Sequence, residues 1–469
     1  MQRKAALILL LVMVLTILAA CAQPTPEVVK ETVVVTKEVE KVVEVTKEVE
    51  KVVEVTKEVE KVVEVTPVAG RCAPTNPDEV DKILIGATGP LSAPGSVVGG
   101  LVMQWSLNIA VKHINEAGGV LGKPVDLVFY DTEGLPERGT AVAERLITQD
   151  CVVAIVGEYH SAVGLTMMEV AHKYHVPVVF AETWNDKITG SHYDEIFRIA
   201  PASSMVAEAD ANYIKDLGAE FVVIVAENSD YGVPAAEATQ KRLADRGIDS
   251  EIFLAEIGTQ DWSPIIARIQ ALDRTPDVVL TLVTGEASYN FEQQAAEAGL
   301  MPTEETVCIA NQVAINPEFW ENVPDGNYCV FRKVGLVPAL ANDVTKKFEA
   351  EYRKQFDRFP ESYALEAYDS LLIMADAINR AGSLDPDAII DALEETDMIG
   401  AQGHYYFPYG RKNPVPSDQP EWMWHQWPEP AVLFLQYFEQ GQSADEAAVV
   451  WPERYQTHGT FLIPYGSKP

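Results

Sequence analysis

The chain has 469 residues, of which 47% are apolar, and 70 acidic residues against 36 lysines and arginines give it a formal net charge of −34. This apolar content is sufficient for more than one hydrophobic core and argues against a disordered protein. Because nucleic-acid binding requires a basic surface, so acidic a chain is not expected to have DNA or RNA as a partner.

The first twenty residues have the three parts of an export signal. Arg3 and Lys4 precede an apolar run that is too short for an ordinary membrane span, and small residues lead up to Cys21. The sequence Leu-Ala-Ala-Cys resembles a bacterial lipobox. We therefore predict that residues 1–20 are a lipoprotein signal peptide and that a lipidated Cys21 anchors the protein to the outer face of the cytoplasmic membrane. The alternative is a simple signal peptide with an incidental cysteine.

A ten-residue repeat follows this signal. The sequence KEVEKVVEVT begins at Lys37, Lys47 and Lys57. Folded repeat arrays have longer units, so we interpret residues 21–80 as a lipid-anchored linker. Its conformation stays open between a stalk that is part helical and part extended and a coiled coil formed with another chain.

From Asp81 the pattern predicts two series of alternating strands and helices. The first series has strands over 82–89, 123–133, 151–157 and 176–182, with helices over 103–119, 139–150 and 161–175. The second has strands over 220–230, 250–257, 277–285 and 306–313, with helices over 204–218, 235–247, 263–273 and 290–299. Helices are also expected over 342–355, 363–382 and 386–396, followed by short strands only. Helical crossovers between strands indicate parallel sheets, so we predict an α/β fold with two lobes.

Motifs of catalysis and metal binding are lacking in the sequence. It contains no HExxH, no GxSxG and no complete phosphate loop. His172 and His175 lie one turn apart, but no set of further ligands with zinc spacing accompanies them, which favours a surface pair. We therefore predict no catalytic residue, no metal, no cofactor and no enzyme activity.

Polar residues follow several of the predicted strands, where open α/β sheets bind their ligands. These residues are Ser92, Ser96, Ser161, Thr183, Tyr231 and Thr284. Ser161 begins a helix, so its hydroxyl and the nearby N–H groups form a suitable place for a carboxylate. Each residue could instead serve only in capping or turns, but their shared position at strand ends favours a ligand site.

Four segments carry a resemblance to a known family. INEAGGVLGKP at 114–124, YDTE at 130–133, SDYG at 229–232 and EAYDSLLIMADAINRAG at 366–382 resemble the leucine/isoleucine/valine-binding family of ABC-transporter solute receptors. The similarity runs from about Ile83 to about Phe407. It implies a type I periplasmic binding fold, with two Rossmann-like lobes joined by three crossovers. The expected boundaries are 81–201 with 337–403 for the first lobe, and 202–336 with 404–469 for the second.

The same resemblance implies a function. We expect a monomeric extracytoplasmic receptor that captures a small polar organic solute, an amino acid or a related compound, and presents it to an ABC permease. The alternative is a ligand-sensing receptor module for an amide, a urea or a small carboxylate.

Carried over by position, the resemblance also implies roles for residues of the site. Ser161 and Thr183 would hold the ligand carboxylate, and Tyr231 would close over the ligand from the second lobe. Tyr159 and Ala181 are further expected ligand contacts. Members of the family often place a carboxylate after the strand predicted at 306–313, to pair with an ammonium group, but this chain has Asn311 and Gln312 there. Whether Glu286, Asp230 or Gln312 takes that place stays open.

Four cysteines lie after the linker or at its end, and four cysteines allow three pairings. Cys308 lies in the last predicted strand of the second lobe and Cys329 follows after a short loop, so we pair them. Cys72 precedes the first strand and Cys151 begins the third. These strands are neighbours in a doubly wound sheet, so Cys72 and Cys151 form the second predicted disulfide.

Overall fold

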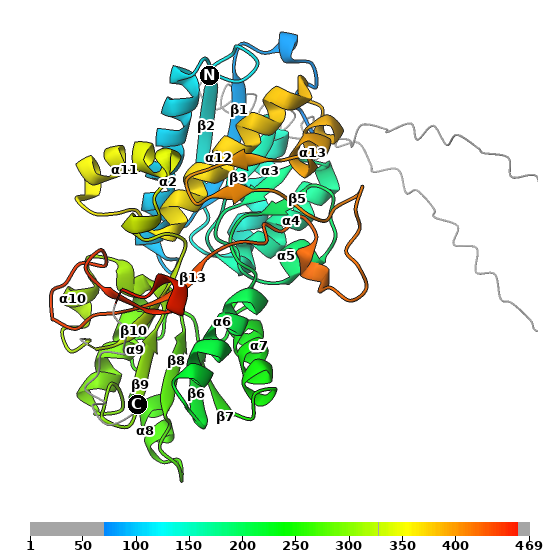
Figure 1. Ribbon diagram of the computed structural model, residues 1–469. Coiled ribbons are helices and arrows are strands. Elements are labelled where there is room, and N and C mark those ends of the chain that lie inside the picture. Colours follow the sequence, from blue (N-terminus) through cyan, green and yellow to red (C-terminus); the bar gives the residue numbers. More distant parts are fainter. Residues whose placement is uncertain (1–69, 327, 458–469) are drawn as a thin grey trace, which may run out of the picture. The chain divides into compact units, whose positions relative to one another are not determined.

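The computed structural model describes residues 70–326 and 328–457 (Figure 1). The predicted signal peptide, Cys21 and the ten-residue repeats lie outside the described residues. Within the described part, no helix has both the length and the apolar character needed to cross a membrane.

The first lobe is built on a five-stranded parallel sheet. Its strands, in spatial order, are β2 (Val125–Asp131), β1 (Ile83–Gly89), β3 (Ala154–Gly157), β4 (Val178–Phe180) and β5 (Ile196–Arg198). β1, β3 and β4 are almost entirely buried, as expected for parallel strands that are covered on both faces.

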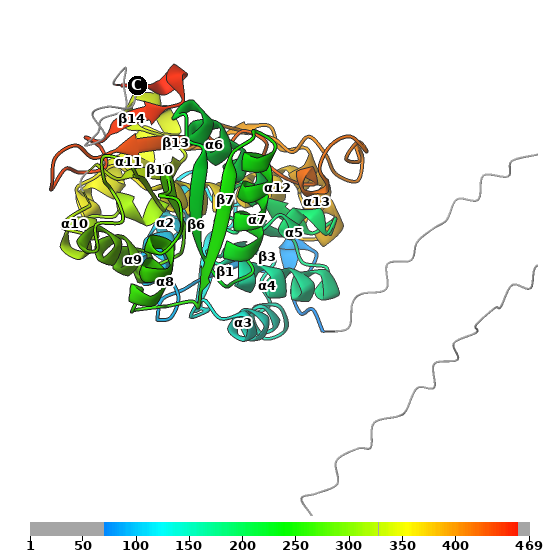
Figure 2. The same cartoon turned by 90° about the horizontal axis from the view of Figure 1, so that it is seen from below.

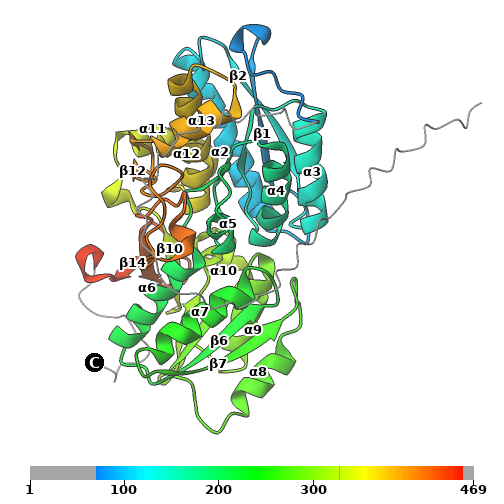
Figure 3. The ribbon, with the colours of Figure 1, turned by 90° about the vertical axis from the view of Figure 1, so that its right-hand side faces the viewer.

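Helices cover both faces of this sheet, which Figure 3 shows from the side. α2 (Val97–Glu116) and α12 (Ser362–Ala381) pack on one face, and α3 (Pro136–Thr148) and α4 (Ser161–Tyr174) pack on the other. α11 (Asp343–Phe356) joins the first pair through Trp105 of α2, whose ring contacts three aromatic rings of α11. The remaining elements associated with this sheet are α5 (Lys187–Gly190), α13 (Pro386–Glu394) and the antiparallel pair β11 (Met398–Ile399) and β12 (His404–Tyr405).

The second lobe has a seven-stranded mixed sheet, seen in Figure 2 with β6 and β7 toward the viewer. Its order is β14 (Ala448–Trp451), β13 (Val432–Gln436), β10 (Val330–Val334), β9 (Val307–Ala310), β8 (Val278–Leu282), β6 (Phe221–Glu227) and β7 (Asp249–Ala255). The five strands from β7 to β10 are parallel, whereas β13 and β14 add antiparallel pairs at one edge. α6 (Ser203–Asp216) and α7 (Gly232–Ala244) pack on one face, α8 (Ser263–Gln270) and α9 (Glu286–Glu297) on the other, and α10 (Phe319–Asn322) is a short helix after β9.

The chain passes between the two sheets three times: after β5, after β10 and before β13. The predicted architecture of two lobes joined by three crossovers is therefore confirmed. Gln426 ties two of these crossings together, since its side-chain amide donates to the carbonyls of Ala200 at 2.8 Å and Trp427 at 2.6 Å.

Two short parallel strands were not among the predicted elements. β5 has three residues and β10 has five, and neither shows alternation or length enough to stand out in sequence.

The segment 404–427 also differs from the expectation, because residues predicted with the second lobe contact the first. Arg198 of β5 donates its backbone N–H to the carbonyl of His425 at 3.0 Å, and Trp427 donates to the carbonyl of Arg198 at 2.9 Å. The segment is thus held to β5 before the chain crosses to β13.

Both predicted disulfides are confirmed. Cys72 is bonded to Cys151, and Cys308 is bonded to Cys329, across sequence separations of 79 and 21 residues. The first disulfide attaches the residues that precede β1 to the start of the β3 region. Because it closes the longer loop, the entropy it removes from the unfolded chain is the larger of the two.

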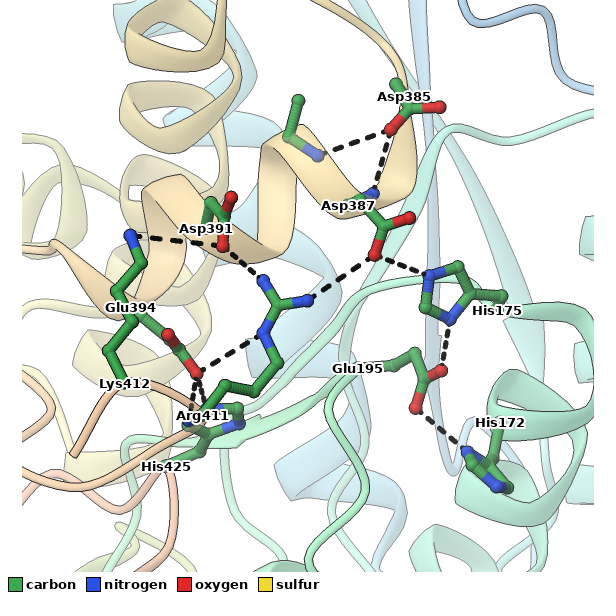
Figure 4. A network of polar contacts seen from close by, with 11 residues as sticks. His172, His175, Glu195, Asp385, Asp387, Asp391, Glu394, Arg411, Lys412 and His425 are labelled. Carbon is green, nitrogen blue, oxygen red and sulfur yellow. Dashed lines mark hydrogen bonds and ion pairs between the residues drawn. The ribbon is translucent and has the colours of Figure 1, made fainter. Parts of the chain in front are cut away.

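A network of charged side chains joins α4, β5 and α13 (Figure 4). The buried carboxylate of Glu195 binds both histidines of the predicted surface pair, His172 Nδ1 at 3.0 Å and His175 Nδ1. His175 Nε2 lies 3.1 Å from Asp387 of α13, which Arg411 also contacts at 3.4 Å. In the described part of the chain, no group of three or more His, Cys, Asp or Glu side chains could hold a metal ion. The two histidines share the buried carboxylate of Glu195 as a hydrogen-bond partner.

This network predicts a pH-dependent contribution to stability. The hydrogen bond with Glu195 raises the pKa of His175 to about 9, above its ordinary value of 6.5. Because the pKa is higher in the folded state, protonated His175 stabilises the fold. This contribution to the free energy of unfolding is complete below about pH 6.5 and is lost as the pH rises through 9. The free energy of unfolding of wild type should therefore exceed that of His175→Gln by about 1–2 kcal/mol at pH 6, and the difference should vanish near pH 10.

Urea denaturation of both proteins across this pH range measures the effect. His404→Gln, which changes an exposed histidine outside the network, serves as the control and should follow wild type. The prediction is contradicted if the free energies of unfolding of wild type and His175→Gln differ by the same amount at every pH from 6 to 10. Protonation of His175 would then not be coupled to folding.

Candidate ligand-binding site

A cleft lies where the carboxyl ends of the strands of the two sheets meet. Its lining consists of Tyr159, His160, Ser161, Glu182 and Trp184 from the first lobe and Tyr231, Thr284, Asn311 and Gln312 from the second. The inner cavity is about 30 Å³, space for one or two water molecules, so the lobes lie close together in this structure. It adjoins a wider cavity of about 300 Å³ that shares His160, Ser161, Tyr231 and Thr284 with it.

The loop between β4 and α5 forms the first lobe's side of this cleft, and Ser161 holds it. The Oγ atom of Ser161 accepts the backbone N–H groups of Trp184 at 2.9 Å and Asn185 at 3.0 Å. Its own O–H therefore remains to donate to a ligand. Ser161 is also the first residue of α4, whose first N–H groups lack helical partners and attract anions.

Arg198 holds the same loop from behind. Its Nη1 donates to the carbonyls of Asn185 at 2.6 Å and Thr183 at 3.2 Å, and its Nε donates to Gln426 at 2.5 Å. Burial lowers the pKa of Arg198 to about 10, so the guanidinium is still charged at neutral pH. The loop thus has hydrogen bonds on both sides of its backbone, which fixes the positions of Thr183 and Trp184.

In the second lobe, the segment SDYG places Tyr231 at the start of α7. Ser229 donates to Glu227 at 2.6 Å and accepts the N–H groups of Tyr231 at 3.2 Å and Gly232 at 3.0 Å. A Cβ atom at Gly232 would lie 2.1 Å from the carbonyl oxygen of Glu227, so only glycine fits there. Thr284 donates its hydroxyl to the same carboxylate at 2.7 Å and can only accept from a ligand.

Several contacts join the two lobes at the cleft. The rings of Trp184 and Tyr231 meet edge to face with centroids 6.0 Å apart. The side-chain amide of Asn185 donates to the carbonyl of Asp230, and the amide of Gln312 donates to the Oε1 atom of Glu182. Both lobes therefore contribute directly to one enclosed polar site.

The structure separates the predicted site residues into three groups. Tyr159, Ser161, Tyr231, Thr284 and Gln312 line the cleft together. Ser96 lies beside it and donates its N–H to His160 Nε2 at 3.0 Å, while Ala181 and Thr183 are fully buried behind it. Ser92 is outside the cleft and donates to Asp131 at 2.5 Å, and Glu286 and Asp230 are exposed. The ligand roles of these residues stay predictions.

Four lining residues were not among the predicted site residues: His160, Glu182, Trp184 and Asn311. Glu182 had a detectable signal, because it is a charged residue two positions after the apolar strand β4 and stands between two predicted site residues. Desolvation lowers the pKa of His160 to about 4, so the imidazole is neutral. Its Nε2 accepts from Ser96, which leaves the proton on Nδ1.

The hydroxyl groups at the cleft are uncharged donors at neutral pH. Burial, followed by the nearby carboxylate of Glu182, raises the pKa of Tyr159 above its ordinary range. Burial likewise raises the pKa of Tyr231 to about 12. With the O–H of Ser161 and the start of α4, these groups can bind a small anionic or polar group without transferring a proton.

Comparisons with known proteins agree with this geometry. The sequence model of the periplasmic binding protein family matches residues 82–414. A Leu/Ile/Val-binding protein of Rhizobium johnstonii is 27% identical over 330 residues, which cover 68% of this chain and 84% of that protein. A leucine binding protein of Thermotoga maritima has a similar structure, with a TM-score of 0.67 at 23% identity, covering 77% of this chain and 96% of that one. A solute binding protein of Rhodopseudomonas palustris in complex with benzoate gives a TM-score of 0.66 at 17% identity, covering 79% and 98%.

The chain belongs to the periplasmic binding protein family, and the resemblance to its leucine/isoleucine/valine-binding members is confirmed. These relatives and structural neighbours are solute-binding proteins, in agreement with the prediction that the chain is not an enzyme.

Two substitutions in the first lobe distinguish support of the loop from contact with the ligand. Ser161→Ala removes the acceptor of two buried N–H groups, so it should lower the free energy of unfolding by about 1–3 kcal/mol and weaken solute binding about tenfold to hundredfold. Thr183→Val keeps the side-chain shape and removes a buried hydroxyl that has no partner among the described residues. It should leave stability unchanged or raised and weaken binding by about tenfold.

Urea denaturation measures the free energy of unfolding of both variants. Titration calorimetry measures their affinity for the solute that mass spectrometry of the purified wild-type protein identifies. If both variants bind like wild type, the predicted carboxylate contacts of Ser161 and Thr183 are wrong.

Proposed function

We propose that this protein is the extracytoplasmic solute receptor of an ABC importer and that it captures a small polar organic solute, an amino acid or a related carboxylate, between its two lobes. The observation that carries this proposal is the cleft whose polar lining comes from strand ends of both lobes. Relatives and structural neighbours named for binding Leu/Ile/Val or leucine, and one in complex with benzoate, support a small carboxylate as the ligand.

The mechanism follows from this division of the lining. A solute held by the first lobe reaches the second lobe only when the lobes close, so contacts with both lobes stabilise the closed state. The three crossovers are the only backbone connections between the sheets of the described part, and relative motion of the lobes is taken up there. The closed, loaded form would then be presented to the permease, and no chemical step on the solute is involved.

The direct test is to purify the protein without refolding and to identify any bound small molecule by mass spectrometry. Recovery of a small organic solute that rebinds in titration calorimetry would support the proposal. A protein that carries no solute and binds none of a broad set of amino acids and organic acids would contradict it.

Removal of the second lobe's aromatic contact should impair closure. Tyr231→Ala deletes the ring that meets Trp184, which should weaken binding by roughly thirtyfold, about 2 kcal/mol. Small-angle scattering should show that saturating solute compacts wild type but compacts Tyr231→Ala less. Tyr231→Phe keeps the ring and serves as the control. Equal compaction of wild type and Tyr231→Ala would mean that closure depends on other residues.

Lipid anchoring at Cys21 should make the mature protein partition into detergent, because acyl chains contribute about 0.8 kcal/mol per buried CH₂ group. Cys21→Ala should move the protein to the aqueous phase, whereas Ala22→Ser should leave the partitioning of wild type unchanged. A wild-type protein that is wholly soluble and has a free thiol at Cys21 would contradict the anchor.

A further inference from the structure

A second cavity lies between the lobes, apart from the solute cleft. Its volume is about 320 Å³, within the range of roughly 300–1,000 Å³ that is typical of small-molecule pockets. Among the described residues, none lines both this cavity and either of the two cavities at the cleft. The second lobe contributes Trp320 of α10, Lys333 of β10 and Tyr437 after β13, and the first lobe contributes Phe356, Phe359 and Glu361.

Lys333 has a position in this cavity that the fold does not explain. It belongs to the buried strand β10, is only 2% exposed, and forms no hydrogen bond or ion pair with another described residue. Its Nζ atom lies 5.2 Å from the centroid of the Phe359 ring, so the ammonium has a cation–π contact. Burial lowers the pKa of this ammonium, because a buried charge is costly when acceptors are missing. A ligand in the cavity can supply the acceptor.

The preceding residue, Arg332, shows the partners that a buried cation of this sheet has elsewhere. Its guanidinium donates to the carbonyl of Thr281 at 2.7 Å and pairs with the carboxylate of Asp210 at 3.4 Å. Successive side chains of a strand point to opposite faces of the sheet, so Lys333 lies on the other face from these acceptors. The position of Arg332 is therefore explained by the fold alone, whereas that of Lys333 is not.

Two carboxylates act electrostatically on Lys333, but the protein already provides both with donors. The donors are Arg353 and the backbone N–H of Phe359 for Asp445, and Tyr352 and Arg358 for Glu361. Arg358 binds Glu361 through its Nε atom, which leaves its two Nη groups as further donors in the lining of the cavity. A third carboxylate of the lining, that of Asp357, is exposed to solvent. The buried part of the cavity thus has unused donors and satisfied acceptors.

We propose that this cavity is a second ligand site, which binds a small organic anion with an aromatic or branched apolar body through an ion pair with Lys333. The inference goes beyond the proposed receptor function, because the site is separate from the solute cleft. The apolar body would lie among the rings of Trp320, Phe356 and Tyr437, and the carboxylate would accept from the ammonium. An apolar pocket with a few polar groups is the usual composition of a small-molecule site.

An occupant of this cavity would also influence the solute cleft. The short 3-10 turn η2 (Gln312–Ile315) begins at the cleft with Gln312 and ends at the second cavity with Ile315. Tyr437, which lines the second cavity, donates to the carbonyl of Ala314 in this turn at 2.8 Å. A ligand that contacts both lobes here would stabilise their present arrangement. Solute and second ligand should therefore each raise the affinity for the other.

The first test is titration calorimetry with phenylacetate and indole-3-acetate, on protein whose cleft is saturated with the solute identified by mass spectrometry. Phenylacetamide and indole-3-acetamide, which keep the rings and lack the charge, are the matched controls. We expect the acids to bind with a Kd below about 1 mM and the amides to bind about tenfold to hundredfold more weakly. Acids that bind only while the cleft is empty, or that bind no better than the amides, would overturn the proposal and leave the receptor function intact.

The second test uses Lys333→Met, which keeps a long side chain and removes the charge. This variant should bind the acids about tenfold to hundredfold more weakly, and its free energy of unfolding should be unchanged or raised. Lys347→Met, which changes an exposed lysine of α11 outside the cavity, is the control and should bind the acids like wild type. Folded Ser161→Ala should also bind the acids like wild type, because Ser161 lies in the solute cleft. Equal affinity of wild type and Lys333→Met for the acids, or loss of it in Ser161→Ala, would overturn the assignment.

The third test concerns the coupling and rests on the proposed receptor function. Saturating phenylacetate should raise the affinity of wild type for its solute by about fivefold and leave that of Lys333→Met unchanged. An unchanged solute affinity of wild type with phenylacetate bound would overturn the coupling. If the protein has no solute, the receptor function is contradicted, and the comparison of wild type with Lys333→Met still tests the second site.

Discussion

The buried guanidinium of Arg198 fixes the loop on which the first lobe's side of the cleft depends. Its donors satisfy the carbonyls of Thr183 and Asn185 and the hydroxyl of Thr189, and its Nε binds Gln426. A buried positive charge is tolerated in this place because five-donor arginine can satisfy several acceptors in one plane. The result is a loop whose backbone is bonded to Arg198 on one side and to Ser161 on the other, so that Glu182 and Trp184 present their side chains to the cleft from a rigid support.

Arg198 also connects this loop to the crossings between the lobes. Gln426 accepts from Arg198 and donates to Ala200 and Trp427, which lie at the first and third crossings. The return of segment 404–427 to β5 before the chain enters β13 therefore has a physical role, since it provides this glutamine. The ends of two crossings are therefore attached to the first lobe, which holds the loop. Rotation of the lobes has to take place on the second-lobe side of Ala200 and Trp427.

The sequence allowed prediction of the elements that have strong periodicity, and the position of the cleft followed from them. The strands that carry Tyr159, Ser161 and Tyr231 at their ends are long or apolar enough to be recognised, and parallel strands bring their carboxyl ends to one edge. Ser92 shares such a position, but its hydroxyl binds Asp131, a partner that only the pairing of β1 with β2 brings near. The packing of segment 404–427 against β5 could not be predicted from the sequence either, because its contacts join residues more than two hundred positions apart.

Glu366 illustrates a different limit. It stands within the apolar helix α12, where an ionisable residue is a visible anomaly, yet its partner Glu182 lies 184 positions away and after a strand of only three residues. The lobes have distinct tasks in the proposed function. The first lobe holds the donor-rich start of α4, so it can bind a solute before closure. The second lobe supplies Tyr231 and Gln312. Because Gln312 donates to Glu182 in this structure, the two lobes are held together by a hydrogen bond across the cleft, and closure over a solute that lies between them requires this glutamine to share or change its acceptor.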